Sequence, residues 1–332
     1  MPARNAEPFV AEAVESILRQ TFEDFELVVL DDASTDATRT IVERYTEDRR
    51  VRIVDGPGAG LTPALNVVCA AARGELLARM DADDIALPRR LERQVARLDD
   101  PELAAVGGAV ELLDSRGVVT GVARYPLEPE AVAATLMTYN CVPHGAVTMR
   151  RSAFEACGRY RLPYAEDYDL WLRMAERWQL ANLAHPVLRL RSHGARFSLR
   201  RVEAQAIGAL LVRTAAAARR AGRADMLAPE SVPTRELARS LGSSDAEIDD
   251  AIVDAFATVA AQEPASADEL VARAAAVTRV DAAGVRVAAA LRAAGPRAPL
   301  RIAGLVARHP LRATAELRRI HRMRPQGRVE RS

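Results

Sequence analysis

The chain has 332 residues, 49% of them hydrophobic, so it is long enough to bury a sizeable core in one large domain or two smaller ones. Its formal net charge is only +1, so the chain has no strong positive potential to attract nucleic acid, and we do not expect a nucleic-acid partner. Its three cysteines lack metal-type spacing, and no apolar run reaches the roughly 20 residues of a membrane span, so we expect a cytoplasmic protein with reduced thiols.

The first third of the chain alternates the apolar spacing of helices with short apolar runs typical of buried parallel strands. Asn5 is a candidate cap for the first helix, and Ser34 or Asp36 for the second. This alternation predicts an open α/β sheet. Strands are predicted at residues 27–30, 51–54 and 76–80, and helices at residues 10–18, 36–45, 62–72 and 88–98.

The pattern becomes mixed after residue 104. Strands are predicted at residues 106–113, 146–149 and 188–190, and a helix at residues 167–178. Beyond residue 200, Ala, Arg, Leu and Val dominate, and prolines punctuate stretches with helical character. We therefore divide the chain into an α/β domain at residues 1–200 and a helical C-terminal region at residues 201–332.

Carboxylates cluster directly after two of the predicted strands. Asp31 and Asp32 follow the first, and Asp81, Asp83 and Asp84 follow the later one. Ligands of open parallel sheets bind at the carboxyl ends of strands, so both groups are expected at one edge. Clustered carboxylates repel one another unless a hard cation such as Mg²⁺ or Mn²⁺ neutralises them. The alternative is that they are polar loop residues and helix caps.

Four segments, in this order, resemble motifs of the family 2 glycosyltransferases, which have the GT-A fold. The resemblance covers residues 1–200 and implies a Rossmann-like, mostly parallel sheet with helices on both faces. It also implies transfer of a sugar from a nucleotide-diphosphate donor to an acceptor hydroxyl, with inversion, in synthesis of cell-surface polysaccharide or glycoconjugate. The segments are residues 25–36 (FELVVLDDASTD), 78–84 (ARMDADD), 166–173 (EDYDLWLR) and 191–193 (RSH).

The resemblance also implies roles for individual residues. Asp167 would be the catalytic base that accepts the proton of the acceptor hydroxyl. Asp83 would bind a Mg²⁺ or Mn²⁺ ion that stabilises the leaving diphosphate, with Asp81 on the metal or the donor sugar. His193 would contact the metal or the diphosphate. The donor site would further include Pro2, Arg4, Asp31, Asp32, Asn66 and Arg191.

Other interpretations stay open at this point. Asp167 and Asp169 could simply complement the dipole at the start of a helix. His144 could contact a ligand or be an ordinary loop residue, and Trp171 favours a place in the core. A sugar-phosphate nucleotidyltransferase is disfavoured because no Gly-rich phosphate loop follows the first residues. A catalytically inactive nucleotide-sugar-binding protein is disfavoured because Asp83 and Asp167 are both present.

The two ends of the chain carry two further expectations. The family's sheet opens with an apolar strand before a Pro-x-x-Asn element, which here is residues 2–5, so we expect that strand to be missing, with the natural start upstream or a poorly folded product. Residues 300–332 hold nine arginines and two glutamates among apolar positions. Such a segment can lie on anionic lipid at the inner face of the membrane, which would suit a lipid-linked acceptor. A solvated basic tail is the alternative.

Overall fold

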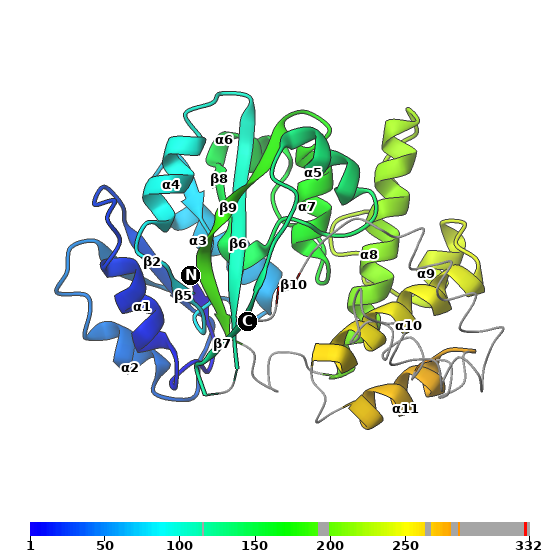
Figure 1. Ribbon diagram of the computed structural model, residues 1–332, viewed down its shortest axis with the longest axis horizontal. Coiled ribbons are helices and arrows are strands. Elements are labelled where there is room, and N and C mark those ends of the chain that lie inside the picture. The colour runs from blue at the N-terminus through cyan, green and yellow to red at the C-terminus, as the bar shows by residue number, and fades with distance from the viewer. Residues whose placement is uncertain (115, 192–198, 263–266, 280–284, 286–328, 331–332) are drawn as a thin grey trace.

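The computed structural model describes residues 1–114, 116–191, 199–262, 267–279, 285 and 329–330. Within these ranges the chain forms two β-sheets covered by helices, followed by a group of helices beside them (Figure 1). The predicted α/β class is therefore confirmed.

The first sheet is fully parallel, in the order β1-β2-β3. Its middle strand, β2, is buried along its whole length, as its uninterrupted apolar run predicts. A helix links β1 to β2 and another links β2 to β3, which gives the βαβ arrangement expected of parallel neighbours. The strands are β1 (Pro2–Ala3), β2 (Leu27–Asp31) and β3 (Val51–Asp55), and the helices are α1 (Val10–Leu18), α2 (Thr38–Glu43) and, after β3, α3 (Leu61–Ala71).

Two residues of the Pro-x-x-Asn element, Pro2 and Ala3, form the short strand β1. It pairs in parallel with the Leu30 and Asp31 end of β2. The N–H groups of Leu30 and Asp32 donate to the carbonyl oxygens of Met1 and Ala3, at 2.9 and 2.8 Å. The proline of β1 lacks an N–H, and it is tolerated because β1 lies at the edge of this sheet. Residues 2 and 3 therefore pair with the carboxyl end of β2, and the expectation of a missing strand before them stays a prediction.

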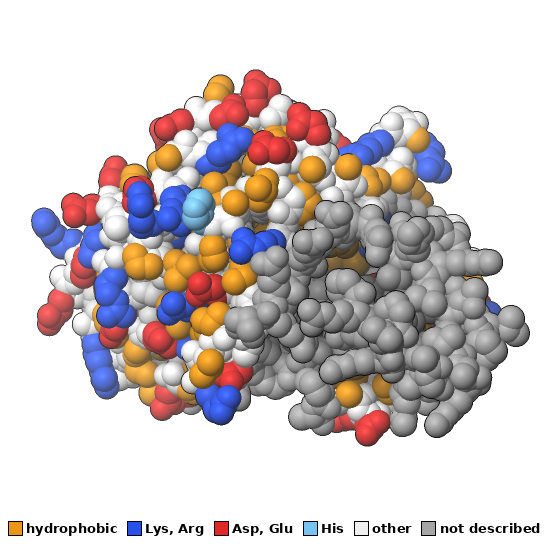
Figure 2. Space-filling model, in the orientation of Figure 1, with side chains coloured by type: hydrophobic (Ala, Val, Ile, Leu, Met, Phe, Trp, Pro, Cys, Tyr) orange, Lys and Arg blue, Asp and Glu red, His pale blue; other side chains and the backbone are white. Residues whose placement is uncertain are grey.

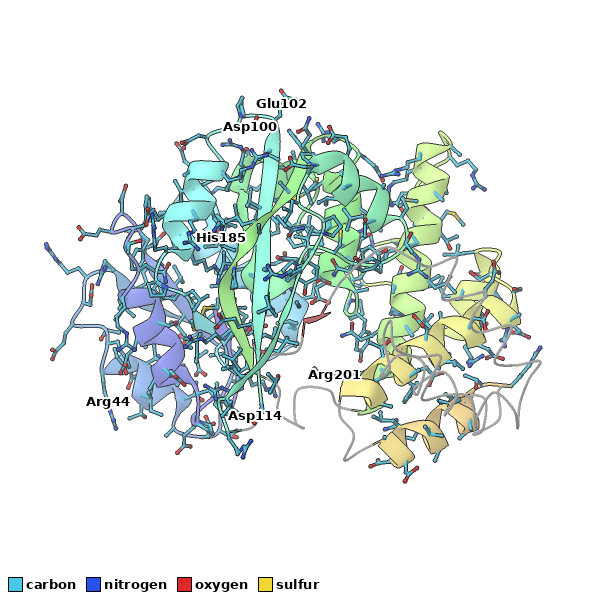
Figure 3. All side chains as sticks on the ribbon, in the orientation of Figure 1. Arg44, Asp100, Glu102, Asp114, His185 and Arg201 are labelled. Carbon is cyan, nitrogen blue, oxygen red and sulfur yellow. The ribbon has the colours of Figure 1, made fainter. Side chains whose placement is uncertain are left out.

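The second sheet is mixed, with the order β10-β7-β6-β8-β4 and with β9 pairing both β5 and β6. Its longest contact is the parallel pair β6 and β9, whereas its other pairs are antiparallel. Figure 3 shows β6 running the height of the sheet, from Glu102 at one end to Asp114 at the other. The strands are β4 (Leu76–Ala78), β5 (Ile85–Ala86), β6 (Leu103–Leu113), β7 (Val119–Ala123), β8 (Thr148–Arg150), β9 (Gln179–Arg191) and β10 (Val329–Glu330).

Helices and one 3₁₀ turn surround this sheet and continue into the C-terminal group. The long helix α8 packs against both α7 and α10. None of the helices in the described residues has the length and apolar character to cross a bilayer. Their bounds are α4 (Arg90–Arg97), α5 (Pro129–Leu136), η1 (His144–Ala146), α6 (Arg151–Ala156), α7 (Glu166–Met174), α8 (Leu199–Arg220), α9 (Arg235–Ser240), α10 (Asp245–Gln262) and α11 (Ala267–Val277).

The charged side chains of the described residues show no segregation by sign in the view of Figure 2. In the face shown in Figure 2, acidic and basic side chains are interspersed over the described residues, as a net charge near zero suggests. Apart from β10, the basic tail at residues 300–332 lies outside the described residues, so its membrane contact stays a prediction.

One predicted helix cap is wrong and another has a local role. Helix α1 begins at Val10 with Phe9 at its N-cap, and no side chain caps it. Asn5 instead accepts a hydrogen bond from the Thr35 backbone N–H at 2.8 Å, which ties the loop after β1 to the loop after β2. Asp36 accepts one from the N–H of the first residue of α2 at 3.0 Å.

Candidate active site

The aspartate segment after β4 presents three carboxylates together. Ligand atoms of Asp81, Asp83 and Asp84 all lie within 4.8 Å of one another. The alternate residues, Met80 and Ala82, are buried in the hydrophobic cluster that also holds β1 and β2. Residues 82 and 83 form a turn, in which the Asp84 N–H donates to the Asp81 carbonyl at 3.4 Å, and this turn brings the three carboxylates together. The three aspartates after β4 therefore cluster as expected, but β2 and β4 belong to different sheets, so Asp31 and Asp32 do not share a sheet edge with them.

A buried arginine that the sequence did not single out lies next to this cluster. Arg79 is only 7% exposed, and its Nη1 is 2.6 Å from Asp81 Oδ2. Burial alone would lower the pKa of Arg79, but the Asp81 carboxylate outweighs it and the net pKa is raised. Arg79 is thus a fixed positive charge that offsets part of the repulsion among the aspartates.

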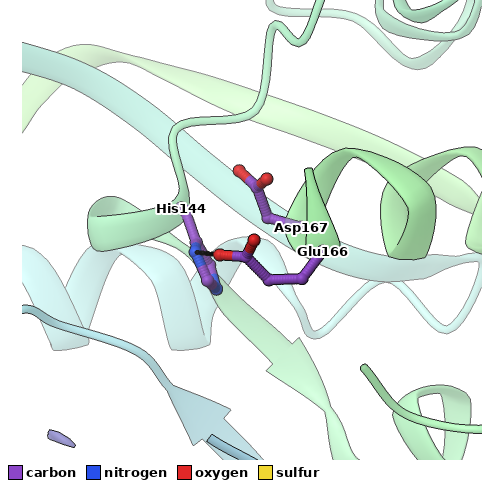
Figure 4. Close-up of side chains that lie close together, drawn as sticks. All are labelled: His144, Glu166 and Asp167. Atoms are coloured by element: carbon purple, nitrogen blue, oxygen red, sulfur yellow. Dashed lines mark ion pairs between the residues drawn. The ribbon is translucent and has the colours of Figure 1, made fainter. Parts of the chain in front are cut away.

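A second acidic group lies at the start of α7, where Glu166 and Asp167 project beside His144 (Figure 4). Ligand atoms of the three side chains lie within 4.8 Å of one another. Asp167 accepts hydrogen bonds from Asn140 Nδ2 at 2.7 Å and from the Tyr168 N–H at 2.8 Å. These donors fix the orientation of its carboxylate.

The electrostatics of this group differ from residue to residue. Burial, with the neighbouring charge of Asp167, raises the pKa of Glu166 to about 8. Burial also raises the pKa of Asp167, although the Asn140 hydrogen bond opposes this. Burial lowers the pKa of His144 well below its usual range, so the ring is neutral and its 3.7 Å contact with Glu166 is no strong ion pair. At neutral pH Glu166 is therefore mostly protonated.

The two acidic groups share one electrostatic neighbourhood. Gly145, next to His144, packs so closely that a Cβ built on it lies 3.0 Å from Asp84 Oδ2 and 3.2 Å from Arg79 Nη1. The charge of Arg79 lowers the pKa of both Glu166 and Asp167, opposing the effect of burial. The metal candidates and the predicted base thus both lie within the electrostatic reach of Arg79.

The predicted nucleotide residues gather at the carboxyl ends of β1 and β2. Asp32 accepts a hydrogen bond from the Gly58 N–H at 2.7 Å and lies 3.7 Å from the guanidinium of Arg4. Asp31 accepts one from the Ser34 N–H at 3.3 Å. Both aspartates are buried. A loop that wraps the end of a parallel strand in this way is where ligands bind in α/β folds.

Two further candidates are Asn66, whose side chain contacts the protein backbone, and His193. The Asn66 side chain donates to the Tyr160 carbonyl at 2.8 Å and accepts from the Tyr160 N–H at 3.2 Å, so it anchors Tyr160, and any contact with a nucleotide stays a prediction. Tyr160 in turn places its hydroxyl 2.9 Å from His144 Nε2. His193 lies outside the described residues.

Arg191, the predicted diphosphate ligand, is engaged by protein groups. Its Nε donates to the Asp83 carbonyl at 3.2 Å and its Nη2 to Glu12 at 2.6 Å, and its guanidinium stacks over Phe9 at 5.0 Å. Its backbone N–H donates to Asp84 at 3.2 Å. Arg191 therefore fastens the aspartate segment to α1. Trp171, by contrast, is fully buried, in agreement with the core assignment.

Comparisons with known proteins bear on the family. The model of the Glycosyl transferase family 2 matches residues 1–158. The putative glycosyltransferase EpsE of Bacillus subtilis is 35% identical over 216 residues, which are 63% of this chain and 77% of that protein. The UDP-Glc:alpha-D-GlcNAc-diphosphoundecaprenol beta-1,3-glucosyltransferase WfgD of Escherichia coli is 27% identical over 173 residues, which are 52% of this chain and 66% of that protein.

A solved structure shares the fold along most of the chain. The mannosyltransferase PcManGT of Pyrobaculum calidifontis, in complex with GDP-Man and Mn²⁺, superposes with a TM-score of 0.54 at 20% identity, covering 95% of this chain and 85% of that one. The likeness extends over the sheets and the helices described above. This likeness shows the GT-A fold, and the EpsE match together with the family model shows that the chain belongs to the family 2 glycosyltransferases.

Proposed function

We propose that the protein transfers a sugar from a nucleotide-diphosphate donor to an acceptor hydroxyl, with inversion at the anomeric carbon. Asp167 is the base, and Asp83 with Asp81 binds a Mg²⁺ or Mn²⁺ ion. One observation supports this most strongly: a cluster of aspartates and a buried carboxyl pair both lie within the electrostatic reach of one buried arginine, Arg79.

The aspartate segment fits a hard divalent cation. Its oxygen ligands lie within 4.8 Å of one another, and Mg²⁺ and Mn²⁺ prefer carboxylate oxygens. A bound cation would stabilise the negative charge of the departing nucleotide diphosphate. In this account Asp83 and Asp81 hold the ion, Arg79 orients Asp81, and Asp31 and Asp32 hold the nucleoside. The Mn²⁺ in the mannosyltransferase of the same fold supports testing that ion first.

The surroundings of Asp167 suit a base. Its carboxylate is held by two donors, and its raised pKa makes it a stronger proton acceptor than an exposed aspartate. The acceptor oxygen attacks the anomeric carbon as its proton passes to Asp167, while the bond from that carbon to the diphosphate oxygen breaks. A base across the sugar from the departing diphosphate gives in-line displacement, and therefore inversion.

The name of one relative supports a class of acceptor and a biosynthetic role for this chain. The name of WfgD gives a diphosphoundecaprenol-linked sugar as acceptor, which supports a lipid-linked acceptor and a role in cell-surface glycoconjugate synthesis for this chain also. A basic C-terminal segment at the membrane surface would bring the enzyme to such an acceptor.

A donor panel tests the proposal. UDP-Glc, UDP-GlcNAc and GDP-Man are each incubated with the protein and Mn²⁺, Mg²⁺ or EDTA, and released nucleotide diphosphate is measured. We expect release from one class of donor with the ions, none in EDTA, and a loss of at least about 100-fold in Asp83→Asn. Asp99→Asn, on an exposed surface residue, is the matched control and should behave as the native chain. Equal release in EDTA and Mn²⁺ would refute the metal-dependent mechanism.

The pH dependence should respond to Asn140. Its hydrogen bond stabilises the ionised form of Asp167 and so lowers the pKa of that carboxyl. The rate requires ionised Asp167 and falls as the pH drops through this pKa. Asn140→Ala should therefore move the acid limb of the kcat/KM profile to higher pH. A limb that stays in place or moves to lower pH would mean that another group carries it.

A further inference from the structure

Helix α8, from the C-terminal region, packs against the residue that precedes the Glu166–Asp167 pair. Gly208 of α8 is buried, and a Cβ built on it lies 3.2 Å from Ala165 Cβ and 3.3 Å from the Tyr164 carbonyl oxygen. Ala165 is the N-cap of α7 and has a left-handed backbone, with φ of 55°. A non-glycine residue keeps this conformation only where its surroundings hold it. At Gly208, α8 therefore packs tightly against the turn that precedes the two carboxyl groups.

The same helix also contacts the segment that carries Asn140, the hydrogen-bond donor to Asp167. Arg213 of α8 donates from Nη1 to the Thr138 carbonyl at 3.1 Å. Two residues further along, Asn140 donates to Asp167 Oδ2 at 2.7 Å. α8 thus contacts both the turn before Asp167 and the segment that binds its carboxylate.

The segment after α8 is joined to α7 through Arg161. Arg161 donates from Nε and Nη2 to the two carboxylate oxygens of Asp169, each at 2.8 Å. Its Nη1 donates to Asp225 Oδ2 at 2.7 Å and to the Leu227 carbonyl at 3.0 Å. The Glu230 N–H donates back to the Arg161 carbonyl at 2.7 Å. One guanidinium therefore joins α7 to the chain that follows α8.

Apolar packing completes the contact. Trp171, Leu172 and Met174 of α7 belong to the same buried cluster as the inward residues of α8. Because that cluster is continuous, a displacement of α8 cannot be absorbed without moving α7.

We propose that residues 199–231 form a positioning element for the reaction, with Gly208 and Arg213 as positioning residues that hold Asp167 in its attacking orientation. This rests on the proposed role of Asp167 as base. A single segment contacts both the turn before Asp167 and the chain that carries the hydrogen-bond donor of Asp167. A displacement of about 1 Å at a reacting group can cost about 100-fold in rate. The C-terminal helices are then part of the acceptor side of the active site.

The experiment compares Gly208→Val with Ala217→Val in the full chain. Ala217 lies on the exposed face of α8, so both variants place the same β-branched residue in the same helix. Nucleotide diphosphate release from UDP-Glc, UDP-GlcNAc and GDP-Man is measured with Mn²⁺, together with the Kd of UDP and GDP. Hydrogen exchange of the residue 165–170 amides gives a reading that needs no substrate.

We expect Gly208→Val to lose at least about tenfold in release rate. Its Kd for UDP or GDP should stay within about twofold, because only the acceptor side is disturbed. Exchange at residues 165–170 should be faster, and Ala217→Val should match the native chain in every reading. Native-like release and exchange in Gly208→Val would overturn the proposal, and so would a parallel loss of nucleotide binding.

A smaller change keeps the proposal testable if Gly208→Val does not fold. Gly208→Ala raises helix propensity yet still places its Cβ 3.2 Å from that of Ala165, so it should slow release without lowering thermal stability. Native-like release and exchange in Gly208→Ala would then overturn it.

Asp167→Asn is measured in parallel to separate the two proposals. If that variant keeps its activity, the proposed base is wrong. If activity is lost in Asp167→Asn and kept in the Gly208 variants, only the positioning role is refuted.

Discussion

Asp167→Asn should lower kcat by about 10²- to 10⁴-fold while leaving the donor KM nearly unchanged, because an amide cannot accept the proton of the attacking hydroxyl. The substitution preserves shape, and the amide oxygen can still accept the hydrogen bond that either Asn140 or the Tyr168 N–H now donates. Steady-state kinetics with the donor that the panel identifies, at saturating Mn²⁺, give both constants.

The neighbouring carboxyl group provides the matched control. The raised pKa of Glu166, about 8, means that this side chain is mostly protonated at pH 7, and glutamine resembles that form. Glu166→Gln should therefore keep most of the activity at pH 7. Retention of more than about a tenth of kcat in Asp167→Asn would contradict its assignment as the base.

Asp169→Ala should destabilise the fold by about 3 to 5 kcal/mol, although Asp169 lies only two residues from the predicted base. Its carboxylate is completely buried between two arginines, with Arg161 Nη2 at 2.8 Å and Arg173 Nη2 at 2.7 Å. Removing it leaves two largely buried guanidinium groups without their shared counter-charge. Urea denaturation of both proteins measures the change in the free energy of unfolding.

The partly exposed end of the same network is the control. The Asp225 side chain is 27% exposed and also pairs with Arg161, at 2.7 Å. Solvent screens this pair, so Asp225→Ala should cost only about 1 kcal/mol or less. A loss in Asp169→Ala no greater than in Asp225→Ala would show that the buried carboxylate does not hold the network together.

The elements that the sequence predicts well are those whose signal is local. The apolar run before Asp31 and Asp32 gives β2 almost to the residue, and the predicted helix at residues 167–178 appears as Glu166–Met174. Asn5 fails as a cap because its side chain is taken by a backbone N–H 30 residues away. β7 and α6 have only five and six residues, too few to show a clear periodic pattern of apolar positions. No local pattern predicts such elements.

The candidate site shows the same limit. The motifs place Asp81, Asp83 and Asp167 in the chain, but the residues that set their environment come from elsewhere. Asn140, the donor to Asp167, lies 27 residues before it, and nothing in its own segment marks it. The sequence does signal Arg79, because an arginine immediately before an acidic cluster is a natural counter-charge. Only the folded chain shows that it also lies beside the carboxyl pair.

Anomalous scattering from a crystal soaked with Mn²⁺ and UDP or GDP would locate the bound manganese without reference to activity. Two groups of side chains in the described residues have the spacing to hold an ion, Asp81 with Asp83 and Asp84, and His144 with Glu166 and Asp167. The account predicts an anomalous peak at the first group, in contact with Asp83 and the diphosphate. A peak at the second group instead would make Asp167 a metal ligand and contradict its role as the base.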